Sequence, residues 1–242
     1  MAEPKIIFQD DYILVIDKPS GLVVNRAESV RGKTLQDWLE SNFQFSIFNF
    51  QLYRSGIVHR LDKDTSGVMV IAKNAKSFTN LQKQFKERKV IKKYLALVHG
   101  KLEPRIGNIK MPLARNPVDR KKFSVRLGGR KAVTEYRVLK TYQLSELYQD
   151  STPGVEQLSL LEINLKTGRT HQIRVHLKHI NHPLVSDTIY LGEKRLKHDK
   201  VWCPRLFLHA KYLSFFHPKT GERIEFKVEL PIELKQTIKK LS

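Results

Sequence analysis

Cysteine is almost absent from this chain, since Cys203 is the only one among its 242 residues. A single cysteine excludes an internal disulfide and is typical of proteins from reducing compartments. The sequence also lacks the run of about 20 apolar residues that a membrane-spanning helix needs. No apolar stretch of a secretory signal follows the opening residues Met1–Lys5. We therefore expect a cytoplasmic protein that makes no use of a membrane.

Acidic residues are scarce relative to basic ones. Lys and Arg number 44 against 24 Asp and Glu, which gives a net charge of +20. The cations are bunched near residues 83–93, 115–131, 166–178 and 194–200. A clustered surplus of this kind attracts polyanions, so nucleic acid is the favoured partner. An anionic membrane is the weaker alternative, because no basic helix carries a long apolar face.

Apolar, β-branched segments outnumber helical ones. Strands are expected at residues 12–17, 22–24, 57–59, 68–72, 93–100, 131–142 and 157–165, with a hairpin across 206–229. Helices are expected after Thr34, over 75–87 and over 171–180, and an exposed loop over 144–156. Many strands with few helices between them favour an α+β fold with a mixed or mainly antiparallel sheet. We expect a single domain over residues 1–242.

A polar loop, residues 60–67 (RLDKDTSG), separates two short apolar segments. Asp62 and Asp64 therefore stand at a strand end, where side chains face solvent or a cleft. From spacing alone, the simpler interpretation is that both carboxylates cap a turn. A calcium loop is disfavoured because no Glu occupies the closing position, near Ala75.

A second motif, residues 166–174 (KTGRTHQIR), places a glycine turn before a helix that Thr170 could cap. The free N–H groups at such a helix start bind anions, and Arg169 would stand at the mouth of the site. The alternative is an ordinary capped helix with surface arginines.

The histidines at positions 176, 179 and 182 suggest a metal cluster at first sight. No Cys or Asp with ligand spacing completes a four-ligand zinc site, so polar helix and loop histidines are favoured. Tyr94, on a strand that follows a basic helix, is either a half-buried strand aromatic or a platform for a nucleobase.

Five segments, taken in order, resemble the RluA-type pseudouridine synthases. They are DKPSGLVV (17–24), HRLDKDTSG (59–67), KYLA (93–96), TGRTHQIR (167–174) and LHA (208–210), and the resemblance covers about residues 6–230. It implies a mixed, mainly antiparallel sheet with flanking helices and a basic central cleft. It also implies an isomerase that converts specific uridines of ribosomal or transfer RNA to pseudouridine, with no cofactor and no metal.

The resemblance implies roles for individual residues. Asp62 matches the catalytic aspartate, Arg60 an arginine near the flipped nucleotide, and Tyr94 the tyrosine that stacks on the target base. Arg169 matches the basic residue paired with the aspartate. Further RNA-binding residues are expected at His171, Arg174, Lys121 and Lys122. Whether Asp62 attacks C1′ or first removes the 2′ proton is left open.

Three departures from the family pattern stand out. The first strand begins close to Met1, so we expect the catalytic domain alone, without an N-terminal S4-like domain. Asn25 and Arg26 stand where relatives often carry His-Pro, and the basic segment 193–205 has no match.

The expected protein is a monomer without an obligate protein partner. The alternatives are a non-catalytic RNA-binding factor, or a metal-dependent nuclease or hydrolase using Asp62, Asp64 and the histidines.

Overall fold

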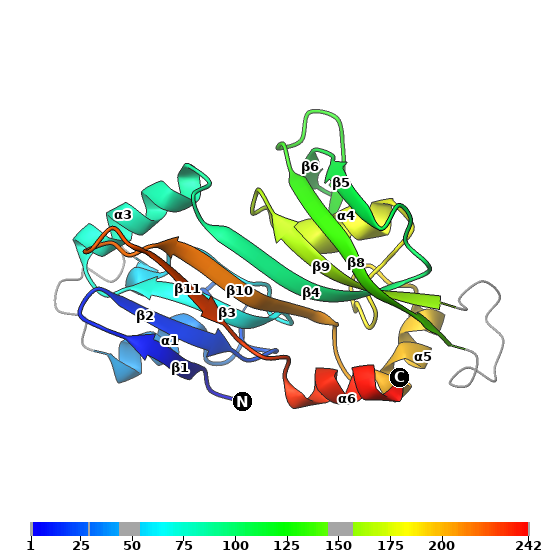
Figure 1. Cartoon of the computed structure of the whole chain (residues 1–242), viewed down its shortest axis with the longest axis horizontal. Helices are drawn as coiled ribbons and strands as arrows, with labels where there is room; N and C mark the ends of the chain where they lie inside the picture. The colour runs from blue at the N-terminus through cyan, green and yellow to red at the C-terminus, as the bar shows by residue number, and fades with distance from the viewer. Residues whose placement is uncertain (1, 29, 44–53, 145–156, 242) are drawn as a thin grey trace. The chain divides into compact units, whose positions relative to one another are not determined.

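The computed structural model describes residues 2–28, 30–43, 54–144 and 157–241. The chain divides into two compact units. Figure 1 colours its elements by residue number, from blue at the N-terminus to red at the C-terminus. Unit 1 comprises Met1–Lys92 and Ala210–Glu229, and unit 2 comprises Lys93–His209 and Leu230–Ser242. The single domain over residues 1–242 stays a prediction.

Unit 1 is built on strands in the order β1-β2-β3-β10, with β11 added to β10. The pairs β1–β2, β2–β3 and β10–β11 are antiparallel. Helix α3 packs on this sheet through Phe78 and Leu81, which join a core with Val15, Val70 and Phe215. The bounds of its elements are β1 Lys5–Gln9, β2 Ile13–Lys18, α1 Leu35–Asn42, η1 Arg54–Gly56, β3 Ser66–Ala72, α3 Ala75–Lys86, β10 Leu208–Phe216 and β11 Arg223–Lys227.

Unit 2 carries the strand order β4-β9-β8-β5 and a separate antiparallel pair, β6-β7. Helix α4 lies against β7 and β8. The core includes Leu97, Tyr142, Trp202, Phe207 and Leu234. The bounds are β4 Ile91–His99, β5 Ile106–Lys110, β6 Leu113–Arg115, β7 Phe123–Val125, β8 Val133–Gln143, β9 Gln157–Leu165, α4 Gln172–His179, α5 Glu193–Trp202 and α6 Ile232–Lys240.

The expected α+β class with a mainly antiparallel sheet is confirmed. So are the strands at 12–17, 68–72, 93–100, 131–142 and 157–165, the hairpin across 206–229 and the helix over 75–87. Thr34 caps α1 in a reciprocal capping box with Asp37, as expected. Nearly all of the loop expected over 144–156 lies outside the described residues.

Three local expectations are wrong. Residues 22–24 form no strand, because the carbonyls of Val23 and Val24 accept hydrogen bonds from the first N–H groups of α1. Residues 57–59 contribute only an isolated bridge at Ile57. Thr170 does not cap α4, whose N-cap is His171 in the left-handed region with φ 55° and no side-chain cap.

Two sequence motifs meet at Gly67. This glycine has φ +124°, and a Cβ built on it would lie 2.3 Å from the carbonyl oxygen of Ala210. Its other nearest neighbours, at 2.7 Å, are also backbone atoms of Ala210. Glycine is required here both for the dihedral angle and for the space. The segment that follows Asp62 is therefore fixed against the start of β10.

Candidate functional site

Asp62 lies in the loop between Ile57 and β3, and its side chain is half-buried. The backbone N–H of Thr65 donates to the Asp62 carbonyl at 3.2 Å, which closes a turn directly before β3. Leu61 is buried beside it, whereas Arg60 and Lys63 are exposed. The loop thus presents one carboxylate near the surface with cations on both sides.

The loop is held by the turn after β2. Lys18 is fully buried, and its Nζ donates to the carbonyls of Pro19 at 2.8 Å, Leu22 at 2.8 Å and Lys63 at 3.1 Å. The Ser20 hydroxyl donates to the carbonyl of Asp64 at 2.8 Å. Charge-assisted bonds are the stronger class of hydrogen bond, so the backbone around Asp62 is firmly positioned.

His59 fixes the other side of the loop. Its Nε2 accepts the N–H of Val70 at 3.1 Å, and its ring stacks on Phe85 with centroids 4.7 Å apart. Burial, with a smaller contribution from the charge of Lys92, lowers the pKa of His59 to about 3. The ring is therefore neutral at ordinary pH. Burial also lowers the pKa of Lys92 to about 8.

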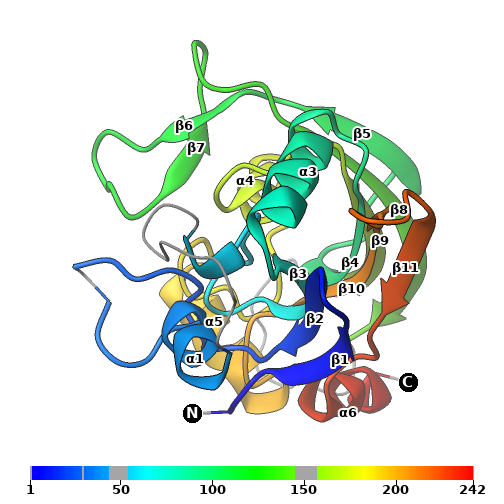
Figure 2. The same cartoon turned by 90° about the vertical axis from the view of Figure 1, so that its left-hand side faces the viewer.

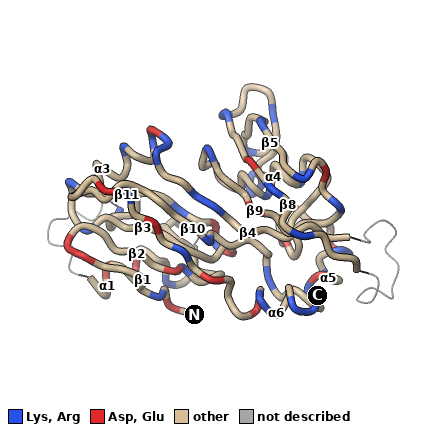
Figure 3. Tube along the Cα trace, in the orientation of Figure 1, with Lys and Arg blue, Asp and Glu red and all other residues tan. Residues whose placement is uncertain are grey.

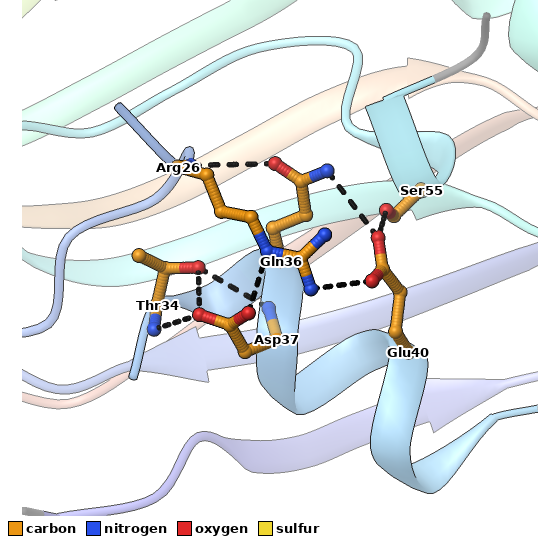
Figure 4. Close-up of polar contacts among 6 residues, drawn as sticks. All are labelled: Arg26, Thr34, Gln36, Asp37, Glu40 and Ser55. Carbon is orange, nitrogen blue, oxygen red and sulfur yellow. Dashed lines mark hydrogen bonds and ion pairs between the residues drawn. The ribbon is translucent and has the colours of Figure 1, made fainter. Parts of the chain in front are cut away.

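A polar cluster around Arg26 ties three segments of unit 1 together (Figure 4). Arg26 forms ion pairs with Asp37 and Glu40 of α1, and the Ser55 hydroxyl of η1 donates to Glu40. Burial opposes the effect, but hydrogen bonds from Ser55 and Arg26 lower the pKa of Glu40. Arg26 therefore anchors its loop to α1.

Tyr94 and Arg169 belong to unit 2 and differ in exposure. Tyr94, opposite Ile163 in the β4–β9 pair, is only 7 % exposed. Arg169 is exposed, and its Nε donates to the carbonyl of Lys131 at 3.3 Å. The N–H of Arg169 donates to the side chain of Gln172 at 3.0 Å. One N–H of the expected anion site is thus already used within the protein.

Arg169 lines a pocket of about 480 Å³ in unit 2. Arg115 and Arg130 contribute further guanidinium groups, and the guanidinium of Arg115 lies 5.3 Å from the ring centre of Phe123, another lining residue. The remaining lining residues are Leu113, Ala114, Gly128, Gly129, Gly168 and Thr170. Three arginines around an open hollow suit an anion with an aromatic or apolar part.

The other expected RNA-binding residues fall into different settings. His171 Nδ1 lies 2.9 Å from the hydroxyl of Tyr190. Lys121 is exposed in the β6–β7 loop, and Lys122 beside it pairs with Asp119 at 3.2 Å. Lys and Arg recur in the loops of unit 2 near β5 and α4 (Figure 3).

The expectation that Arg174 binds RNA has to be revised. Its side chain is only 2 % exposed and bonds Asp187 through two nitrogens, at 2.8 and 2.6 Å. A guanidinium in this position holds α4 against the following loop and is turned away from any surface phosphate. His176 is likewise internal, since its two ring nitrogens contact Thr134 and the carbonyl of Met111.

Among the described residues, no group of three or more His, Cys, Asp or Glu is arranged to hold a metal ion. In the same part of the chain, no helix is long and apolar enough to cross a membrane.

Comparison with known proteins decides the family. The model of a family described as RNA pseudouridylate synthase matches residues 12–179. The chain belongs to the RNA pseudouridylate synthase family.

Relatives and solved structures agree. The chain is 43% identical over 230 residues to a protein of Aquifex aeolicus named an uncharacterized RNA pseudouridine synthase, covering 93% of this chain and 69% of that one. It is 40% identical to ribosomal large subunit pseudouridine synthase D of Nitrosomonas europaea, covering 95% of this chain and 63% of that one. The structure of human RNA pseudouridylate synthase domain containing 1 matches with TM-score 0.72 and 26% identity, covering 95% and 84%.

The sequence motifs of this RNA pseudouridylate synthase identified the loop that carries Asp62. They did not identify the residues that hold this loop in place. Both Lys18 and His59 belong to motifs of the family. Nothing in their spacing indicates that the ammonium of Lys18 is buried among carbonyls or that the ring of His59 is neutral. Both act on backbone groups distant in sequence. The pocket of Arg115, Arg130 and Arg169 also combines residues that no local pattern connects.

Proposed function

We propose that this pseudouridine synthase isomerises one or more uridines in ribosomal or transfer RNA, with Asp62 as the catalytic carboxylate. Ribosomal RNA is favoured, because several relatives are named for the ribosomal large subunit. The observation that carries the assignment is the setting of Asp62: a half-buried carboxylate on a loop that Lys18 and His59 hold in place. Pre-positioning of this kind is what a catalytic group requires.

The reaction is an isomerisation, so no atom is gained or lost overall. The N1–C1′ bond of the uridine breaks, the uracil turns, a C5–C1′ bond forms, and the C5 proton is replaced by a proton at N1. An ionised carboxylate serves either as nucleophile toward C1′ or as base toward the 2′ proton. Asp62 fills that role in the proposal.

Other residues would bind and orient the RNA. Extruding a uridine from its stack costs a few kcal/mol. Stacking on Tyr94, worth about 1–3 kcal/mol per base, would offset this cost together with phosphate contacts from Arg60. Arg169 would supply positive charge to the reacting group, and His171, Lys121 and Lys122 would bind the RNA backbone.

The test is tritium release from RNA transcribed in vitro with uridine tritiated at C5, in the presence of EDTA. Wild type is compared with Asp62→Asn and with the matched control Asp64→Asn from the same loop. We expect release by wild type and by the control within a few-fold, and none by Asp62→Asn, which still binds RNA. Equal release by Asp62→Asn would overturn the site assignment.

Two further outcomes separate the alternatives. RNA binding without tritium release from ribosomal or transfer RNA transcripts would indicate a non-catalytic RNA-binding factor. RNA cleavage that EDTA abolishes would indicate a metal-dependent nuclease. We also propose that the protein acts as a cytoplasmic monomer without a partner subunit. Light scattering of the active fraction tests the oligomeric state, and a dimer mass would contradict it.

A further inference from the structure

The two most exposed large apolar side chains among the described residues lie at opposite ends of the β6–β7 pair. Leu127 is 98 % exposed and Val118 is 93 % exposed, and the next in rank is Val201 on α5 at 82 %. Figure 2 shows β6 and β7 side by side, apart from the strands of the larger sheet. Single exposed apolar residues are common, so what matters is how Leu127 is held and what surrounds it.

Leu127 occupies the corner of a rigid turn, residues 126–129. The N–H of Gly129 donates to the carbonyl of Arg126 at 3.1 Å, and Gly128 adopts φ +79°. A Cβ on Gly129 would approach the carbonyl group of Leu113 to 2.7–2.8 Å, so the turn sits tightly against β6. This backbone presents the leucine to solvent in a fixed direction.

The turn is also pinned at its base. Leu113 and Arg130 exchange two backbone hydrogen bonds, at 2.9 and 2.8 Å, and the N–H of Arg126 donates to the carbonyl of Pro112 at 3.0 Å. A rigid loop loses little entropy when its side chain becomes buried against a partner. The geometry of this turn therefore favours Leu127 as a residue that contacts a binding partner.

The surroundings of Leu127 indicate the partner. Arg126 and Arg130 flank it in sequence, and both are exposed. Gly128, Gly129 and Arg130 line the same pocket as Arg169. The leucine thus stands between two cations at the rim of the pocket of three arginines. Apolar side chains flanked by arginines are used to enter the stack of a nucleic acid while the cations bind phosphates.

We propose that Leu127 is an apolar wedge that enters the RNA next to the target uridine and fills the stack when that base leaves it. This inference rests on the proposed function, because it concerns how the substrate of that reaction is opened. Leu127 positions the RNA and takes no part in the bond changes.

The first test is single-turnover tritium release from two RNA hairpins. One holds the target uridine within a stacked stem, and the other holds it in a bulge, where it is already unstacked. We expect Leu127→Ser to slow release from the stem at least tenfold and from the bulge less than twofold. Leu127→Met should restore the stem rate to within twofold of wild type.

The matched control is Val201→Ser, which removes an exposed aliphatic side chain from the basic helix α5. We expect its rates on both hairpins to equal those of wild type. If Leu127→Ser slowed tritium release equally from the stem and the bulge, Leu127 would be a general RNA contact, and the proposed wedge role would be wrong. No loss, or the same loss in Val201→Ser, would overturn it as well. The melting temperature of Leu127→Ser should be unchanged.

The second test separates this inference from the proposed function. In the Asp62→Asn background, 2-aminopurine placed beside the target position should brighten on binding, and the added Leu127→Ser change should abolish that signal. This readout needs no chemistry, so it can succeed where release fails. Leu127-dependent binding to phosphatidylserine vesicles, with an unaltered RNA signal, would indicate a membrane contact and overturn the inference.

Discussion

The ammonium of Lys18 lies 3.1 Å from the carbonyl oxygen of Lys63, one residue after Asp62. A buried cation at the end of β2 thereby holds the backbone of the proposed catalytic loop from inside the protein. The position of Asp62 therefore depends on this contact as well as on its own neighbours.

Replacing Lys18 with Met should destabilise the protein by about 1–3 kcal/mol, because it leaves carbonyls of the turn without their donor. Urea unfolding measures the loss. Lys5→Met on the exposed β1 is the matched control and should be within about 0.5 kcal/mol of wild type. Activity should fall further than the folded fraction does, because the loop of Asp62 is released. A Lys18→Met protein with full stability and full activity would contradict this role.

Elements with a clear hydrophobic period could be predicted from the sequence. Helix α3 buries Phe78 and Leu81 on one face, and strand β3 is buried along its whole length, so their patterns gave nearly the correct bounds. Helix α5 carries no such period. It is anchored by Asp199, which lies 2.9 Å from His99 of β4 and also accepts the N–H of Ser186. A polar anchor between distant residues leaves no trace in a local pattern.

The candidate site also contains residues that could be predicted from the sequence and residues that could not. Family resemblance pointed to Asp62 and Arg169, because their motifs are short and continuous in sequence. The burial of Arg174 could not be foreseen, since it depends on Asp187 in a later loop. Residues 22–24 look like a strand because they are apolar, yet their carbonyls serve α1 instead.

Lys92→Met should stabilise the protein in a pH-dependent manner. The pKa of Lys92 is about 8 in the folded protein, against an ordinary value of 10.5. The folded state therefore binds fewer protons than the unfolded state between these values, and wild type gains stability as pH rises through that window. The advantage of the variant should be largest below pH 8, at about 3 kcal/mol, and vanish above pH 10.5.

Denaturant unfolding at pH 7.5 and 10.5 measures that difference. Lys89→Met is the control, because Lys89 is exposed and paired with Glu87 at 2.8 Å. A variant of Lys92 that shows the same advantage at both pH values would contradict the pKa assignment.

Arg174→Met should cost about 3–5 kcal/mol, because it leaves the fully buried Asp187 without its partner. Arg174→Met combined with Asp187→Asn should recover part of that loss. Thermal unfolding of Arg174→Met, of Asp187→Asn alone and of the double variant measures the coupling. If Arg174→Met kept its stability but bound RNA with a weaker salt dependence, Arg174 would be an RNA-binding residue after all.

Lys121→Gln with Lys122→Gln should weaken RNA binding without affecting stability, because both side chains lie in a surface loop. Loss of two phosphate contacts would reduce the slope of log affinity against log salt by about 1.5. Filter binding between 50 and 200 mM salt, roughly the range over which such effects are large, measures it. Lys235→Gln with Lys239→Gln on α6 is the equal-charge control. The same slope in wild type and in the loop variant would remove this loop from the RNA footprint.

The contact of Gly67 with Ala210 limits how variants of this protein can be repaired. All three of the nearest atoms to the missing Cβ belong to the backbone of Ala210, at 2.3–2.7 Å. No choice of side chain at position 210 can make room, so a genetic suppressor of Gly67→Ala cannot arise by substitution there. It would have to shift the course of β10 itself. The two motifs therefore act as one steric unit, although most of the chain separates them.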